Sequence, residues 1–201
     1  MIEDTLRLGP SALDVAAAVR RATERAQDEG AVDVTYARVD SPLGTLVAAT
    51  TGHGLVRLAY ERFNGGLDAV LDHLAARVSP RIVEAPARLD PLRRQLDDFF
   101  AGRRRGFDVP LDWSLTSGFT RRVLETTAAI PFGEVGTYQS VATGAGSPKA
   151  TRAAGNALGS NPIPIVVPCH RVLRTGGGLG GYTGGVEKKE KLLALEGVLA
   201  A

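Results

Sequence analysis

The sequence predicts a small α/β domain over residues 31–112, followed by a mainly helical domain over residues 118–201 with a helix-turn-helix. Three observations support this fold class. From 33 to 60, apolar and polar residues alternate between turn residues, which is typical of strands. From 67 to 102, apolar residues recur at helical spacing. Two short helical segments joined by a glycine-rich turn, between 137 and 158, are typical of a helix-turn-helix.

In the α/β domain we expect three strands and two helices. The second helix starts with Asp90 as its cap and Pro91 as its first residue, a favoured pair at that position. The strands cover 34–39, 45–50 and 55–60, the first helix covers 67–78, and the second runs towards Gly102. We also expect residues 1–30 to form an appended helix that opens at Pro10–Ser11 and stops at Gly30, and residues 113–117 to form a linker.

In the helical domain the turn and cap residues define four helices. These are a helix over 119–129, a short helix over 138–141 capped by Thr137, a helix from Ser147–Pro148 to Leu158, and a last helix over 186–199. On the third of these helices Ala150, Ala153, Ala154, Ala157 and Leu158 share an inward face, and Lys149, Thr151, Arg152, Gly155 and Asn156 share the other. This small outer face suits close approach to a nucleic-acid groove, and it equally fits a plain amphipathic helix.

Composition indicates an ordinary globular chain without a membrane span or signal peptide. The 201 residues are 44% hydrophobic and 23% charged. A single cysteine excludes an internal disulfide and favours the cytoplasm. From residue 118 onward there are 9 Lys/Arg against 5 Asp/Glu, a weak indication of a polyanionic partner.

The single cysteine, Cys169, stands between Pro168 and the pair His170–Arg171. Nearby cations favour the thiolate, which is the nucleophilic form. Glu196 lies on the apolar face of the last helix and therefore needs a buried partner. A Cys-His-Glu set would act as nucleophile, base and orienting group. The alternative is a Glu196 bonded to backbone amides at the helix end.

Other suggestive features have ordinary interpretations. His53 and His73 lack partners at ligand spacing and are interpreted as surface or packing residues. The glycine-rich run 176–181 contains GxGxxG but does not lead from a strand into a helix, so a flexible loop is the better interpretation. The arginines at 103–105 are interpreted as a solvated helix end.

Several motifs in order make residues 33–201 resemble the O6-alkylguanine-DNA alkyltransferases. They are Phe132-Gly133-Glu134-Val135 with Tyr138, the run from Ser147 to Arg152, Asn161-Pro162, Pro168-Cys169-His170-Arg171, Tyr182-Thr183-Gly184-Gly185, and Leu195-Glu196-Gly197. The resemblance implies a ribonuclease H-like α/β domain and a winged-helix-like helical domain. It also implies direct-reversal DNA repair by a single-turnover methyltransferase. On this resemblance, the alkyl group of O6-alkylguanine in double-stranded DNA is expected to pass irreversibly to Cys169 after base flipping.

The resemblance also implies residue roles. His170 activates Cys169 through a water, Glu196 orients His170, Asn161 stabilises the turn, and Tyr138 rotates the nucleotide and protonates the departing guanine. Arg152 fills the gap left by the extruded base. On the DNA and substrate side it is joined by Thr151, Gly155, Lys149, Tyr182, Thr183 and the carbonyl of Val172, the last together with that of Cys169. No metal, cofactor, membrane or obligate protein partner is expected.

Three alternatives stay open: a non-catalytic protein that binds alkylated DNA, a Cys-His-Glu hydrolase, and a DNA-binding regulator. Cys169 argues against the first, and the helix-turn-helix with Arg152 argues against the second. The third lacks a visible ligand or partner domain. The resemblance also makes O4-alkylthymine a further candidate substrate.

Overall fold

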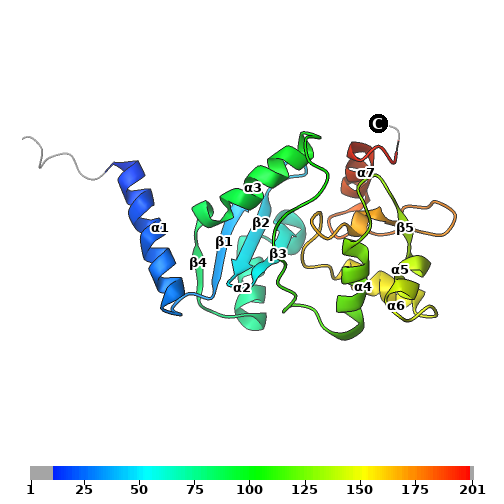
Figure 1. Cartoon of the computed structure of the whole chain (residues 1–201), viewed down its shortest axis with the longest axis horizontal. Coiled ribbons are helices and arrows are strands. Elements are labelled where there is room, and N and C mark those ends of the chain that lie inside the picture. Colours follow the sequence, from blue (N-terminus) through cyan, green and yellow to red (C-terminus); the bar gives the residue numbers. More distant parts are fainter. Residues whose placement is uncertain (1–10, 200–201) are drawn as a thin grey trace, which may run out of the picture.

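A four-stranded sheet forms the centre of the first half of the chain in the computed structural model, which describes residues 11–199 (Figure 1). The strands are β1 (Val34–Val39), β2 (Leu46–Thr51), β3 (Gly54–Tyr60) and β4 (Ile82–Glu84), in the order β3-β2-β1-β4. β2 pairs antiparallel with both β1 and β3, and β4 pairs parallel with β1. The three expected strands are therefore present, and the short β4 is an addition.

Two helices cover opposite faces of this sheet. α2 (Leu67–Arg77) packs Val70 and Leu74 against residues of one face, among them Val47 and Val56. α3 (Pro86–Phe100) packs its leucines and Phe99 against the other face. A short 3₁₀ helix, η1 (Arg62–Asn64), connects β3 to α2.

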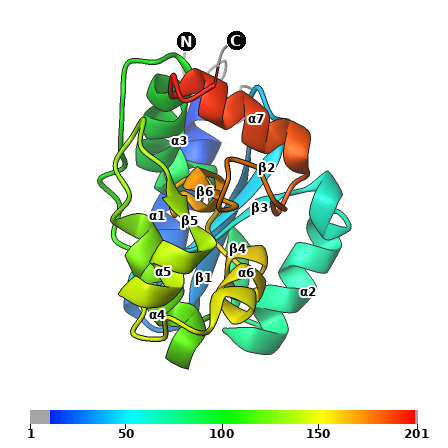
Figure 2. The same cartoon turned by 90° about the vertical axis from the view of Figure 1, so that its right-hand side faces the viewer.

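The second half of the chain is mainly helical, as predicted. It contains α4 (Gly118–Ala128), α5 (Tyr138–Gly144), α6 (Thr151–Gly159), the 3₁₀ helix η2 (Cys169–Arg171) and α7 (Val186–Leu195). β5 (Gly136–Thr137) and β6 (Val172–Leu173) form a small parallel pair. Figure 2 shows α4, α5 and α6 at one end of this half and α7 at the other. The predicted helix-turn-helix is α5 and α6, and the predicted linker over 113–117 contains no helix or strand.

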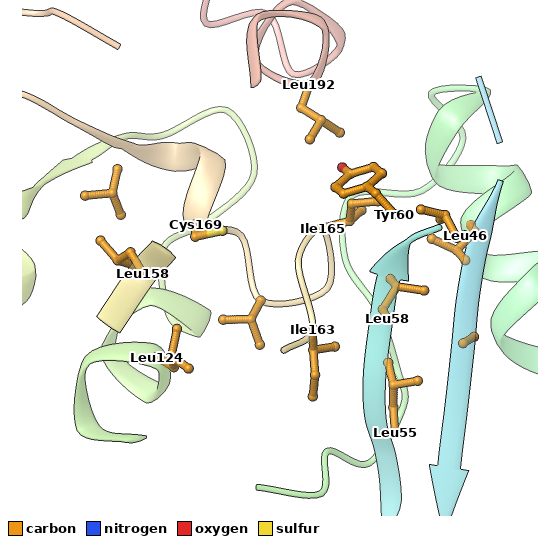
Figure 3. Close-up of a cluster of buried hydrophobic side chains, with 14 of the residues drawn as sticks. Leu46, Leu55, Leu58, Tyr60, Leu124, Leu158, Ile163, Ile165, Cys169 and Leu192 are labelled. Carbon is orange, nitrogen blue, oxygen red and sulfur yellow. The ribbon is translucent and has the colours of Figure 1, made fainter. Parts of the chain in front are cut away.

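One hydrophobic core joins the two halves. It includes Leu55, Leu58 and Tyr60 of β3 together with Ile163 and Ile165 from the second half (Figure 3). The Leu58 amide also donates to the Pro162 carbonyl at 2.9 Å. The outer edge of β3 is thus covered by the segment that leads to Cys169.

The N-terminal helix α1 (Ala12–Asp28) lies at the end of the sheet remote from α4–α7 (Figure 1). The Ser11 hydroxyl accepts from the Asp14 amide at 3.2 Å, which caps the helix as expected. Residues 1–10 of the predicted extension, including Pro10, lie outside the described residues. No helix within 11–199 is long and apolar enough to cross a membrane.

The start predicted for the second helix of the α/β domain is wrong. α3 begins at Pro86, one turn before Asp90, and Pro91 lies inside it. β4 pairs with β1 and ends beside a buried Ala85, whose amide donates to Tyr36. The next turn buries Leu89 against the sheet, so packing extends the helix past an unfavourable proline.

Three details of the predicted helical domain are also corrected. α6 starts at Thr151 because Ser147–Ala150 form a turn, with the Ala150 amide on the Ser147 carbonyl at 2.9 Å. Ala153 is exposed, not packed inward. α7 ends at Leu195, with Glu196 as its C-cap. Gly197 has φ 75°, and the Val198 amide bonds the Leu193 carbonyl at 2.9 Å, so a Schellman motif ends the helix four residues early.

Candidate active site

A tight turn between α6 and η2 holds Cys169 in place. The Asn161 side-chain amide donates to the Val167 carbonyl at 2.9 Å and to Cys169 Sγ at 3.1 Å. Its oxygen accepts from the Ile163 amide at 3.0 Å. Ile165 adopts φ 76°, a rare and costly conformation for a β-branched residue. Asn161 therefore fixes both ends of the turn and also contacts the sulfur.

A buried carboxylate network lies behind the cysteine. His170 Nε2 is 2.8 Å from Glu196 Oε1, and Arg171 donates to both oxygens of Glu196 at 2.9 Å. The Gly133 amide approaches Glu196 at 3.4 Å. Multiple donors offset the cost of burying the charge. The partner expected for Glu196 is therefore present, and the helix-end alternative accounts for at most the Gly133 contact.

The pKa values of this network favour a neutral histidine next to an ionised glutamate. Burial raises the pKa of Glu196, but hydrogen bonds from His170 and Arg171 outweigh it and hold the pKa below its usual value. Burial lowers the pKa of His170 against the opposing effect of Glu196. The other ring nitrogen, Nδ1, is buried and has no hydrogen-bond partner among residues 11–199. Nδ1 is thus the atom on which His170 can accept a proton.

The environment of the thiol differs from the one expected. Burial raises the pKa of Cys169 to about 11, although Asn161 and Lys189 act in the opposite direction. Neighbouring cations therefore do not produce a resting thiolate. A protonated thiol needs a base during the reaction, which gives a neutral His170 a chemical purpose.

Lys189 is a buried cation that is not among the residues predicted from the sequence. Its ammonium donates to the Val172 carbonyl at 2.6 Å and to the Leu179 carbonyl, and burial lowers its pKa to about 8. The available signal was its position seven residues before Glu196, on the same helical face. Lys189 ties α7 to the strand and loop that follow Cys169.

A cavity of about 760 Å³ opens onto the Cys169 side of the network. Seven of the predicted site residues line it: Tyr138, Thr151, Arg152, Gly155, Cys169, Tyr182 and Thr183. Further lining residues that the prediction lacked are Phe63, Leu158, Gly159, Arg174, Thr175 and Gly181. These residues come from α5, α6, η2 and the loop that follows it, while Phe63 comes from η1 in the first half of the chain.

The remaining predicted residues lie outside this lining. Asn161, His170 and Glu196 are buried behind Cys169. Lys149 is exposed in the turn before α6. Val172 is fully buried, and its carbonyl already accepts from Lys189, while the Cys169 carbonyl accepts from the Val172 amide. Each carbonyl keeps a second lone pair for a further donor.

Tyr138 is positioned by the cap of α5. The Thr137 hydroxyl accepts from the Ser140 amide at 3.0 Å, and the Ser140 hydroxyl accepts from the Thr137 amide at 2.9 Å. This capping box fixes Tyr138 as the first helical residue. Its ring lies against Gly155 of α6, where an added Cβ would be 3.7 Å away. Burial raises its pKa, so the phenol is protonated at neutral pH.

No group of three His, Cys, Asp or Glu side chains in the described part of the chain is arranged to hold a metal ion. That the protein binds no metal stays a prediction from the sequence.

Two protein-family models match most of the chain. One is "6-O-methylguanine DNA methyltransferase, ribonuclease-like domain", over residues 34–113. The other is "6-O-methylguanine DNA methyltransferase, DNA binding domain", over residues 118–198.

Individual proteins resemble the chain over almost the same span. The methylated-DNA–protein-cysteine methyltransferase of Mycolicibacterium paratuberculosis is 39% identical over 81% of this chain and 92% of its own length. That of Methanosarcina acetivorans is 40% identical over 81% of this chain and 97% of its own length. The crystal structure of Mycobacterium tuberculosis OGT in complex with DNA is similar with a TM-score of 0.70 at 36% identity, over 81% of this chain and 93% of that one.

Proposed function

The chain belongs to the 6-O-methylguanine DNA methyltransferase family, and on that premise we propose that it transfers the alkyl group of O6-alkylguanine in double-stranded DNA to Cys169. It is a DNA repair protein that acts by direct reversal, with a cysteine as the acceptor. The sequence contains one cysteine. The observation that carries the proposal is that Cys169 lines the cavity of about 760 Å³ while its neighbour His170 pairs with Glu196.

In the proposed reaction Sγ of Cys169 attacks the alkyl carbon as the bond from that carbon to O6 breaks. The thiol proton passes through a water to Nδ1 of His170, and Glu196 stabilises the resulting imidazolium. Tyr138 donates a proton to the departing guanine, and the proton held by His170 then returns through water to Tyr138, so that the net products are the thioether and neutral guanine. Asn161 holds the sulfur and remains hydrogen-bonded to it. A thioether does not hydrolyse, so each molecule reacts once.

The alkyl carbon is inaccessible inside a stacked duplex, so the nucleotide must first be flipped out. We propose that the face of α6 that carries Thr151, Arg152 and Gly155 enters the minor groove. Its small residues permit close approach, and the exposed Arg152 can occupy the space vacated by the base. Lys149 lies just before this face and would contact phosphate in the proposed complex. Tyr182, Thr183 and the Val172 carbonyl would contact the extruded guanine.

Specificity for alkylguanine and the cellular compartment belong to the same proposal. We propose a cytoplasmic location, because the reaction requires Cys169 as a free thiol and reducing compartments maintain thiols in that form.

Intact mass spectrometry tests the function directly. A duplex oligonucleotide with one O6-methylguanine should add one methyl group to the Cys169 peptide and stop reacting at one equivalent. Cys169→Ala should bind the same duplex and repair nothing. Binding without a mass gain would identify a non-catalytic lesion-binding protein, and turnover beyond one equivalent would contradict the acceptor role.

A further inference from the structure

The glycine-rich loop that follows Cys169 forms one side of the cavity. Residues 174–183 contribute Arg174, Thr175, Gly181, Tyr182 and Thr183 to the lining. Three glycines of this loop, Gly176, Gly177 and Gly180, have positive φ, and most residues from 174 to 181 are exposed. Such a segment loses much conformational entropy when it is ordered. The position of Tyr182 therefore depends on what holds the far end of the loop.

Tyr60, at the end of β3, contacts that end of the loop. Its hydroxyl is 2.9 Å from the Tyr182 hydroxyl, and the two rings meet edge to face with centroids 6.1 Å apart. Its ring lies so close to Gly184 that an added Cβ there would be 2.7 Å away. The Lys188 ammonium lies 5.4 Å from the centre of the same ring and donates to the Gly184 carbonyl at 3.0 Å.

Tyr60 itself is held rigidly. It pairs with Leu46 in the sheet, its carbonyl accepts from Asn64 at 2.8 Å, and 2% of its surface is exposed. Figure 3 shows its hydroxyl directed away from the sheet, toward the side where Leu192 and Cys169 lie. The aromatic ring of Tyr182, in turn, meets His170 edge to face with centroids 6.3 Å apart.

We propose that Tyr60, in the first domain, is a positioning residue for alkyl transfer, which acts by holding Tyr182 and the loop against the Cys169 cavity. The inference rests on the proposed function. It assigns the first domain a part in the reaction: the rigid sheet holds the Tyr182 side chain, in addition to the contacts that Lys189 makes at Leu179 and that Thr183 makes at Gly159. Correct placement of Tyr182 and the loop at the side of the cavity would keep the alkyl carbon aligned with Sγ of Cys169.

The test is Tyr60→Phe, which removes one hydroxyl and retains the ring against Gly184 and Lys188. Loss of the hydrogen bond to the Tyr182 hydroxyl should lower the single-turnover rate constant at saturating methylated duplex by about 3- to 10-fold. The duplex concentration for half-maximal rate should stay unchanged, because Tyr60 is buried away from the α6 face. The matched control is Tyr36→Phe. Tyr36 is half-buried and packs against the hydrophobic cluster that contains Val70 and Leu74 of α2, so this change should leave the rate constant and the half-maximal duplex concentration unchanged.

Tyr182→Phe and the double variant complete a cycle. If Tyr60 acts through Tyr182, the double variant should react no more slowly than Tyr182→Phe. Additive losses, an unchanged rate constant for Tyr60→Phe, or a loss confined to the fraction of folded protein would each overturn the inference. If wild-type Cys169 gains no methyl group, the proposed function fails first. If wild type reacts and Tyr60→Phe matches it, only this inference fails.

Discussion

The thiol of Cys169 is more strongly buried than a typical reactive cysteine. Its pKa of about 11 means that the resting site stores a protonated thiol next to a neutral imidazole. This protects the protein from premature reaction, since the thiolate is the nucleophile. In the proposed reaction deprotonation must therefore accompany alkyl transfer, with His170 as the proposed proton acceptor and Glu196 as the group that would stabilise the imidazolium.

This arrangement predicts a flat pH profile for repair. Between the lowered pKa of His170 and the raised pKa of Cys169, the proton moves within the site, so bulk pH does not change the reacting form. The rate constant at saturating methylated duplex should be constant near pH 7, below the pKa of Lys189 of about 8, and should fall at lower pH as His170, whose pKa is lowered by burial, becomes protonated. If the rate constant fell to half of its maximum at or above pH 7, this prediction would be contradicted.

The control for the pH profile is the fraction of folded protein at each pH. His170 and Glu196 both have lowered pKa values in the folded state, so the unfolded state binds more protons in acid and stability falls as pH falls. Acid unfolding monitored by circular dichroism separates this loss from the loss of the base.

At the residue scale the sequence predicted a Cys-His-Glu set, because a carboxylate on an apolar helical face needs a buried partner. It could not show that Arg171 supplies both further hydrogen bonds to Glu196, since that depends on how η2 meets the end of α7. It also could not give the sign of the thiol pKa shift. Neighbouring cations in the sequence suggested a decrease, whereas burial in the fold produces an increase. The roles assigned to Tyr138 and Arg152 stay predictions.

At the element scale, α6 combines a packed face with an unusually small outer face. Ala154, Ala157 and Leu158 are buried, while Gly155 lies against the Tyr138 ring. A glycine within a helix costs about 1 kcal/mol relative to alanine. The space around Gly155 would accept a methyl group, so packing does not explain the glycine. A partner that approaches α6 closely would explain it.

Gly155→Ala should therefore stabilise the protein and weaken DNA binding. Urea unfolding should show a free energy of unfolding higher by about 0.5–1 kcal/mol. Fluorescence anisotropy with unmodified duplex should show a higher Kd, because the added Cβ keeps the backbone from the groove. Gly52→Ala, in the open β2–β3 turn, is the control for DNA binding and should leave the Kd unchanged. Higher stability with an unchanged Kd would contradict close approach at α6.

Most elements were predictable because their periodicity and caps agree, as for β1, α4 and the Thr137 cap of α5. The errors arose where tertiary contacts decide the boundary. Burial of Leu89 extends α3 backward past Pro91, and Gly197 ends α7 through backbone bonds that a helical wheel does not show. β4 was missed because its three residues are defined only by pairing with β1. The domain boundaries at 112 and 118 stay predictions.

At the scale of the whole molecule, the sheet and the helical half share one core. Leu58 and Ile163 belong to the same buried cluster, and a backbone hydrogen bond links β3 to Pro162. The turn that carries Cys169 is therefore supported by the first domain as well as by Asn161. The sequence separates the halves by a linker and could not reveal this shared core.

A shared core predicts that a substitution that destabilises the sheet also destabilises the second half of the chain, which carries Cys169. Leu58→Ala should lower the free energy of unfolding by about 2–5 kcal/mol, as expected for a cavity left by a fully buried leucine. Fluorescence of Trp113, the only tryptophan, reports on the junction, and labelling of Cys169 by a thiol reagent reports on the second half. In urea both signals should shift to the same lower midpoint, because one cooperative unit unfolds in one transition. If the Cys169 midpoint kept its wild-type value while Trp113 shifted, the halves would be independent, and the sheet could not support the acceptor site.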